Sequence, residues 1–426
     1  MKKILLAFVA TFITLYSYSQ TRADYDMVVK KFQSYYNHQQ NDSIYNMLTD
    51  AGKAKLTLEK TEQTFKQVFG SLGEMKAYEF TKEKEKTALY KVTFDKSVLT
   101  LVLAISTEQK LEAFRFIAYQ PENKVPSLDE YILSTKTGEI HGTLSLPDVE
   151  GPVPVVLIIA GSGPTDRDGN NPLAGKTNGY RMLADSLKKA GIASVRYDKR
   201  GIGGSASALS ADNKQYFNDY INDAAGFIKQ LNSDKRFSQV YVLGHREGSL
   251  FAILAANKEL VSGLISIAGA ADPIDLLIEK QLSVQSKSIA EKARVIMDSL
   301  KKGYMVNNIP EGLTDLFNSG MQPYMQTWLK YTPTEELAKL HEPILIVQGT
   351  TDLQVGTDQA KKLNNANDRA QLLIINGMNH VLKNAPEDRA GNLATYSNPD
   401  LALCPGLVSG IVHFITAPPL PIRRKH

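Results

Sequence analysis

Tyr-Val-Leu-Gly-His-Arg-Glu-Gly-Ser, residues 241–249, is the stretch that decides the fold. It begins with an apolar run, and its two glycines, Gly244 and Gly248, stand two residues before and two residues after Arg246. A residue held in a strained turn needs such neighbours, because a strand and a helix approach closely only where side chains are missing. The stretch therefore predicts a buried strand, a sharp turn at Arg246 and the start of a helix. An ordinary turn between a strand and a helix can have a similar sequence, so the surrounding sequence must decide whether this turn is a special one.

Apolar runs recur on both sides of this stretch. Continuous runs of this kind are typical of strands buried on both faces of a parallel sheet. Helical stretches alternate with them, so the sequence predicts the α/β class, with a mostly parallel, doubly wound sheet. Residues from about 273 to 335 contain only amphipathic segments, which predict a helical cap over the carboxyl edge of that sheet. The expected strands are residues 140–146, 154–160, 192–197, 240–243, 264–267, 344–347 and 372–375.

Two polar loops follow the last two expected strands. The first strand leads through Gln-Gly-Thr-Thr to Asp352, and the second leads through Asn-Gly-Met-Asn to His380. Both side chains should project from the carboxyl edge of the sheet, where open α/β sheets bind their ligands. Taken singly, Asp352 has the pattern of a loop cap and His380 that of a surface histidine. Taken together, they form an acid–base pair in which a carboxylate orients an imidazole.

A glycine-rich loop and a second polar turn follow two earlier strands. In the loop, residues 161–163 read Gly-Ser-Gly, and such residues let backbone N–H groups approach a substrate oxygen. The same loop continues with Asp-Arg-Asp at 166–168, which has the pattern of an ion-paired brace rather than of catalytic groups. In the second turn, residues 197–205 read Tyr-Asp-Lys-Arg-Gly-Ile-Gly-Gly-Ser, and Arg200 is expected to tie loops together.

In this order, over residues from about 140 to 416, these stretches resemble secreted bacterial α/β-hydrolases of the serine-esterase type. The resemblance implies a G-x-S-x-G nucleophile turn and the hydrolysis of a carboxylic ester through an acyl-enzyme. It assigns the nucleophile position to Arg246, the acid to Asp352 and the general base to His380. The oxyanion hole would consist of backbone N–H groups from Gly161, Ser162, Gly163 and Glu247.

The implied substrate is a small-molecule ester or acyl compound, and the expected size of its acyl group depends on the cap. No cofactor is implied. The seven histidines are scattered without the spacing of metal ligands, so we expect no metal site. The sequence does not decide the oligomeric state.

Arg246 conflicts with this chemistry, because the nucleophile position should hold a serine. A guanidinium stays protonated and offers no lone pair for attack. Loss of a triad nucleophile costs about a million-fold in turnover, so we expect the chain to be inactive or impaired as an esterase. Ser249 lies about one helical turn further on and should point away from His380, so it is not expected to replace the missing serine.

Three interpretations of Arg246 stay open. The chain is an active esterase altered at one position, since serine and arginine codons can differ by one base and every other part of the site remains. Alternatively, it is a pseudoenzyme that binds a ligand in the old pocket without catalysis. In the third interpretation, Asp352 and His380 act on a bound water in a different reaction.

The N-terminal residues 1–19 have the pattern of a signal peptide. Lys2 and Lys3 precede an apolar run over residues 4–15, and small residues follow it. The run is well short of the roughly 20 apolar residues that a membrane span needs. We therefore expect export to the periplasm or the outside of the cell, without a membrane span.

The rest of the chain is expected to form two domains. Residues 20–120 combine helical periodicity with alternation in period two, which predicts a small α+β domain of the kind that precedes the hydrolase domain in some secreted esterases. Residues 121–135, with Pro121 and Pro126, are expected to be a linker, residues 136–418 the hydrolase domain and residues 419–426 a basic tail. The formal charge of +4 comes largely from the two ends of the chain, which argues against a nucleic-acid partner.

Overall fold

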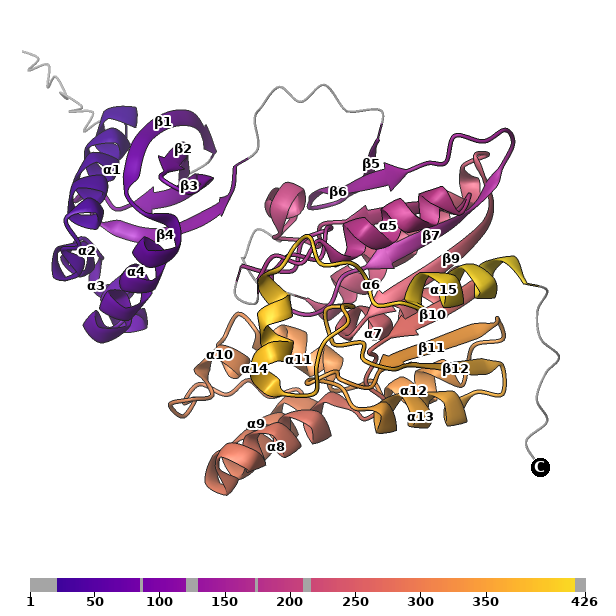
Figure 1. The fold of residues 1–426 in the computed structure, drawn as a ribbon. Helices are drawn as coiled ribbons and strands as arrows, with labels where there is room; N and C mark the ends of the chain where they lie inside the picture. Colours follow the sequence, from indigo (N-terminus) through magenta and orange to yellow (C-terminus); the bar gives the residue numbers. More distant parts are fainter. Residues whose placement is uncertain (1–20, 85–86, 120–128, 173–174, 210–215, 418–426) are drawn as a thin grey trace, which may run out of the picture. The chain divides into compact units, whose positions relative to one another are not determined.

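The structure is a computed structural model that describes residues 21–84, 87–119, 129–172, 175–209 and 216–417. The expected signal peptide and basic tail lie outside these residues, and so do Pro121 and Pro126. The chain divides into two compact units, one up to residue 121 and the other from residue 122 (Figure 1).

The described residues of the first unit form four helices followed by an antiparallel sheet. Phe32 stands at the centre of its aromatic core, with ring centroids 5.7 Å from those of both Phe65 and Phe114. The helices are α1 (Arg22–Asn37), α2 (Asn41–Asn46), α3 (Asp50–Lys55) and α4 (Leu58–Leu72). The strands pair in chain order as β1 (Met75–Lys84), β2 (Thr87–Phe94), β3 (Val98–Ile105) and β4 (Leu111–Ala118).

The second unit is built on an eight-stranded sheet in the order β12-β11-β10-β9-β7-β8-β6-β5. The six strands from β12 to β8 are parallel to one another, and β6 and β5 join them in antiparallel pairing. The predicted α/β class with a mostly parallel sheet is therefore confirmed. The strands are β5 (Glu130–Thr135), β6 (Gly138–Ser145), β7 (Val153–Ile159), β8 (Ala193–Tyr197), β9 (Phe237–His245), β10 (Gly263–Ile267), β11 (Ile344–Gly349) and β12 (Ala370–Ile375).

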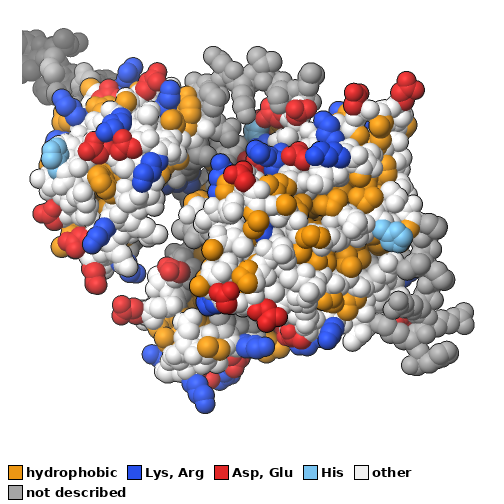
Figure 2. All heavy atoms as spheres, viewed as in Figure 1, with side chains coloured by type: hydrophobic (Ala, Val, Ile, Leu, Met, Phe, Trp, Pro, Cys, Tyr) orange, Lys and Arg blue, Asp and Glu red, His pale blue; other side chains and the backbone are white. Residues whose placement is uncertain are grey.

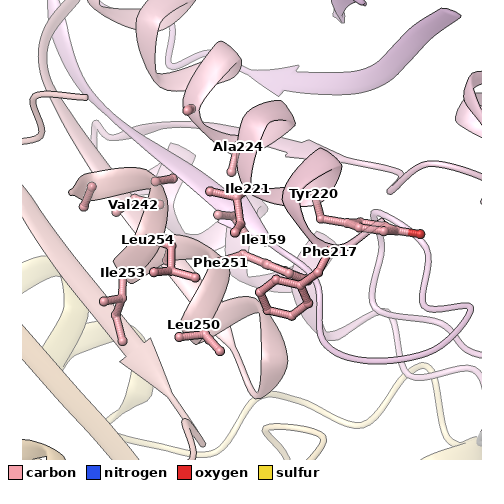
Figure 3. Close-up of a cluster of buried hydrophobic side chains, with 14 of the residues drawn as sticks. Ile159, Phe217, Tyr220, Ile221, Ala224, Val242, Leu250, Phe251, Ile253 and Leu254 are labelled. Atoms are coloured by element: carbon pink, nitrogen blue, oxygen red, sulfur yellow. The ribbon is translucent and has the colours of Figure 1, made fainter. Parts of the chain in front are cut away.

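Helices cover both faces of this sheet. Successive residues of β7 point to opposite faces, so that Leu157 belongs to one apolar cluster and Ile158 to the other. One face packs against α6 (Phe217–Ser233), α7 (Glu247–Ala256) and α13 (Thr357–Ala366). The other packs against α5 (Gly179–Lys189) and α15 (Leu407–Thr416). Figure 3 shows the cluster between α6 and α7, where the ring centroids of Phe217 and Phe251 are 4.9 Å apart.

The segment expected to form a cap is helical. Its helices are α8 (Ile274–Gln285), α9 (Lys287–Lys301), α10 (Thr314–Phe317), α11 (Gln322–Trp328) and α12 (Pro333–Leu337). The segment packs on the layer formed by α6 and α7, where the ring centroids of Trp328 and Phe217 are 5.6 Å apart. The shorter elements among the described residues are η1 (Gly203–Ala208), α14 (Arg389–Ala394) and η2 (Thr395–Ser397).

The linker prediction was wrong at its C-terminal end. Residues 130–135 form the edge strand β5, which pairs with β6, rather than a linker. Tyr131 is buried against Phe227 of α6, with a centroid distance of 6.4 Å, and Leu133 packs beside it. A six-residue edge strand with two inward side chains offers too little alternation to stand out in a sequence.

Buried and partly buried ion pairs hold the loops that follow β7 and β8. Arg167 pairs with Asp198 at 2.8 Å and Arg196 pairs with Asp168 at 2.9 Å, as expected of the Asp-Arg-Asp brace. Arg200 pairs with Asp223 of α6 at 2.5 Å and also donates to the carbonyl of Ala208 at 2.8 Å. It therefore ties its own turn to α6 and to η1, as the sequence predicts.

Replacing Asp223 with alanine is expected to destabilise the fold by about 3–5 kcal/mol, because Arg200 would stay buried without a carboxylate. Both side chains are less than a tenth exposed, at 7% for Arg200 and 2% for Asp223. Burial raises the pKa of Asp223 to about 6, although the bond to Arg200 opposes the rise. Unfolding by denaturant is therefore measured near pH 8, where the carboxylate is charged. Glu291→Ala, which removes an exposed partner of Arg294, is the control and should leave the unfolding midpoint almost unchanged. Equal midpoints for the two variants would contradict the structural role given to the buried pair.

Charged side chains of both signs are interspersed over the face drawn in Figure 2. None of the described helices has the length together with the apolar character that crossing a membrane requires.

Candidate active site

Arg246 occupies the turn between β9 and α7 in a conformation that non-glycine residues rarely adopt. Its φ is 53° and its ψ is −115°, and α7 begins at the next residue. The flanking glycines are required here: a Cβ on Gly244 would lie 2.1 Å from the carbonyl oxygen of Gly248, and a Cβ on Gly248 would lie 2.4 Å from that of Ile159. The strand, sharp turn and helix predicted from this stretch are all present.

Asp352 and His380 meet at the carboxyl edge of the sheet, in the loops that follow β11 and β12. His380 Nδ1 lies 3.0 Å from Asp352 Oδ2, and the second carboxylate oxygen accepts hydrogen bonds from the backbone N–H groups of Gln354 and Val355, at 2.7 and 3.0 Å. Burial raises the pKa of the Asp352 carboxyl, but His380 and these two N–H groups outweigh it and hold the pKa below its ordinary value. The carboxylate therefore stays ionised, as required to orient the imidazole.

His245 lies directly behind His380 and connects it to the glycine-rich loop. Its Nε2 is 3.0 Å from the His380 carbonyl oxygen and therefore carries the proton, which leaves Nδ1 to accept from the Tyr180 hydroxyl at 2.8 Å. Tyr180 in turn accepts from the Gly161 N–H at 3.3 Å. Burial, His380 and Arg246 lower the pKa of His245 to about 3, so this ring is neutral and its tautomer is fixed. These hydrogen bonds fix the position of the His380 loop relative to the 161–163 loop.

The hydrogen bond to Tyr180 corrects one oxyanion assignment. The Gly161 N–H is directed at a tyrosine oxygen, and its carbonyl oxygen accepts from the Lys199 ammonium. Gly161 therefore positions the loop, and the candidates for donors are the N–H groups of Ser162, Gly163 and Glu247. The Glu247 N–H is the first of α7, where N–H groups have no partner within the helix.

Two charged side chains to which the sequence gave no role, those of Lys199 and Glu247, interact electrostatically close to the turn. Lys199 is 4% exposed, and burial lowers the pKa of its ammonium, while the Glu247 carboxylate opposes the decrease and Arg246 adds to it. The Glu247 carboxylate accepts from the Tyr324 hydroxyl of α11 at 2.7 Å. The helical segment thus contacts the turn through this hydrogen bond between Tyr324 and Glu247.

A cavity of about 140 Å³ opens beside Arg246 and His380. Its described lining comes from residues 161–180, from the turn and from the loop that carries His380, and it includes no residue of the 273–335 segment. The described lining therefore gives no support to the expectation that this segment limits the size of the acyl group, which stays a prediction. Further lining residues are Ser162, Thr165, Thr177, Tyr180, His245, Gln354, Val381, Leu382 and Tyr396.

The structure brings together the three residues on which the sequence argument rests, since Arg246 and His380 line one cavity and Asp352 is bonded to His380. Ser249 is turned away and pairs with Ser266, with the two hydroxyl oxygens 2.6 Å apart. Sequence reasoning missed Tyr180 and Tyr396, which reach the cavity from segments with no motif. Lys199 and His245 lie in the stretches 197–205 and 241–249. The signal that could have identified them is a charged or polar residue at the end of a buried strand.

In comparisons with known proteins, the two units of the chain match different families. A family described as serine aminopeptidase, S33, matches residues 173–312, which include Arg246. A family described as a protein of unknown function (DUF3887) matches residues 29–114 in the first unit. Esterase EstD of Thermotoga maritima is 25% identical over 389 residues, which cover 87% of this chain and 91% of the relative.

Solved structures with a similar fold include Est1E from Butyrivibrio proteoclasticus, with a TM-score of 0.42 and 17% identity over 63% of this chain and 94% of that chain. The 2,6-dihydroxy-pseudo-oxynicotine hydrolase has a TM-score of 0.44 and 15% identity over 71% and 72% of the two chains. The strand order, the turn between β9 and α7 and the family match together show that the second unit has the α/β-hydrolase fold.

Proposed function

We propose that this chain has the architecture of a carboxylic-ester hydrolase with a Ser-Asp-His type site, in which Arg246 stands at the nucleophile position and abolishes or impairs the activity. The observation that carries the proposal is the strained turn at Arg246, opening on the same cavity as the His380 that Asp352 orients. The 25% identity to an esterase, extending over both units, supports an ester as the substrate.

With serine at position 246, each group would have a defined role. His380 would take the proton of the serine hydroxyl on its Nε2 as the oxygen attacks the ester carbonyl, while Asp352 holds the Nδ1 proton. The N–H groups of Ser162 and Glu247 would stabilise the oxyanion of the tetrahedral intermediate. His380 would return the proton to the leaving alcohol, and a water activated by His380 would then release the acid from the acyl-enzyme.

With arginine at position 246 the first step has no nucleophile, since the guanidinium carries no available lone pair. The test compares the chain with its Arg246→Ser variant on nitrophenyl acetate and nitrophenyl butyrate. Activity that is present only in the variant supports the proposal, and a folded but inert variant contradicts it.

A non-catalytic ligand-binding protein is the second candidate. One observation favours it: Arg246 lines the cavity, and its guanidinium forms no ion pair with any residue that the structure describes. Export to the periplasm or beyond is part of either proposal and rests on the composition of residues 1–19 alone.

A further inference from the structure

We propose that the cavity beside Arg246 binds a small monocarboxylate, with the Arg246 guanidinium as its counter-ion. This inference rests on the proposed function to the extent that it uses the same cavity, but the binding itself requires no catalysis.

The first observation is a contrast among the arginines of the second unit. Arg167, Arg196 and Arg200 are all more than four-fifths buried, and each is paired with an aspartate at 2.8, 2.9 and 2.5 Å. Arg246 is also partly buried, yet within the described part of the chain it forms no ion pair or hydrogen bond through its guanidinium. A cation that is partly removed from water is costly to leave unpaired, so this site is suited to an anion from solution.

The second observation is a buried hydroxyl in the same cavity. Tyr396 of η2 is 6% exposed and lines the cavity with Arg246. Among the described residues its hydroxyl oxygen forms no hydrogen bond of ordinary geometry, and Gln354 of the same lining is the side chain nearest to forming one. The guanidinium, the hydroxyl and the backbone N–H group of Ser162, which lines the same cavity, are all donors. Two carboxylate oxygens offer about four acceptor positions and match such a set.

The nearby carboxylates are already engaged and do not neutralise Arg246. Asp352 is bonded to His380 and to two backbone N–H groups, and Glu247 is bonded to Tyr324. Lys199 adds a second positive charge close by, but its ammonium is directed at the Gly161 carbonyl oxygen. One cation is therefore available to a ligand, which fits the single charge of a carboxylate better than the double charge of phosphate.

The size and lining of the cavity limit the acid further. A volume of about 140 Å³ is well below the roughly 300–1,000 Å³ of pockets for drug-sized ligands. Val381 and Leu382 contribute apolar surface beside the donors. Short alkyl or single-ring acids, which are the acids that hydrolysis of a small ester releases, fit these limits.

The test is isothermal titration calorimetry of the full chain with butyrate, benzoate, the uncharged butyramide and inorganic phosphate. We expect butyrate or benzoate to bind at least about tenfold more tightly than butyramide, as a charge-assisted bond requires. Arg246→Met keeps much of the side-chain volume without its charge and should weaken carboxylate binding by about tenfold or more. Tyr396→Phe should weaken it by a smaller factor, and Arg181→Met, at an exposed arginine outside the cavity, should leave it unchanged. Circular dichroism and thermal melting establish that each variant is folded.

Equal affinities for butyrate and butyramide, or carboxylate binding that survives Arg246→Met, would overturn the inference. Tighter binding of phosphate than of either acid would also overturn it, because the ligand class would then be wrong. The proposed function can fail separately. An Arg246→Ser variant that hydrolyses esters while the unaltered chain binds no carboxylate removes only the inference, whereas carboxylate binding together with an inert serine variant removes only the proposed function.

Discussion

Arg246→Ser is expected to raise kcat for short nitrophenyl esters by about 10⁴–10⁶-fold over the unaltered chain. The change supplies a hydroxyl at the one position where the strained turn presents a side chain beside His380. At least about 5.5 kcal/mol of the activation barrier should be recovered, because the proposed acid, base and oxyanion donors already surround the turn. Initial rates with nitrophenyl acetate and nitrophenyl butyrate measure the gain.

Arg246→Ala is the matched control for this gain. It removes the cation and enlarges the cavity as serine does, but it provides no nucleophile. We expect kcat of the alanine variant to stay within about tenfold of that of the unaltered chain, because it loses the charge at position 246 without gaining a nucleophile. If alanine and serine gave the same activity, the cation would be an inhibitor of some other reaction and position 246 would not be the nucleophile position.

In the Arg246→Ser background, His380→Ala is expected to remove about 10⁶-fold of kcat and Asp352→Asn about 10⁴-fold. The histidine loss is larger because His380 moves the proton, whereas Asp352 holds the ring through the 3.0 Å contact to Nδ1. KM should change much less than kcat for Asp352→Asn, since the buried carboxylate does not line the cavity.

His341→Ala serves as the control, because this histidine is exposed in the loop before β11. Its rate should equal that of the Arg246→Ser parent. A His380→Ala variant that keeps more than about a tenth of the parent activity would show that another group acts as the base, and the assignment of His380 would then be wrong.

The sheet could be predicted from the sequence because each buried strand is a nearly continuous apolar run. The run expected at 154–160 corresponds to β7 and the run expected at 344–347 to β11, within one or two residues at their ends. Strand β5 was missed because an edge strand is covered on fewer sides and needs fewer apolar residues. A sequence pattern reports burial, so it weakens where burial is partial.

The sequence could predict only the part of the site that follows from the order of strands and loops along the chain. Asp352 and His380 follow parallel strands, and parallel strands bring their carboxyl ends to the same edge of a sheet. The contact between Tyr180 and His245 joins segments 65 positions apart through the conformation of a long loop, which no local pattern encodes. For the same reason, the sequence placed Gly161 among the oxyanion donors, although its N–H is directed at the Tyr180 hydroxyl.

The most direct test of the central claim is covalent labelling of the Arg246→Ser variant with a fluorophosphonate, followed by intact mass measurement and peptide mapping. This reagent reacts with serines that a neighbouring base activates. We expect one adduct per chain, located at position 246, lost when His380 is replaced by alanine and absent from the unaltered chain. A folded variant that takes up no label, or an adduct on Ser162 or Ser249 instead, would contradict the assignment of position 246 as the nucleophile position of a hydrolase site.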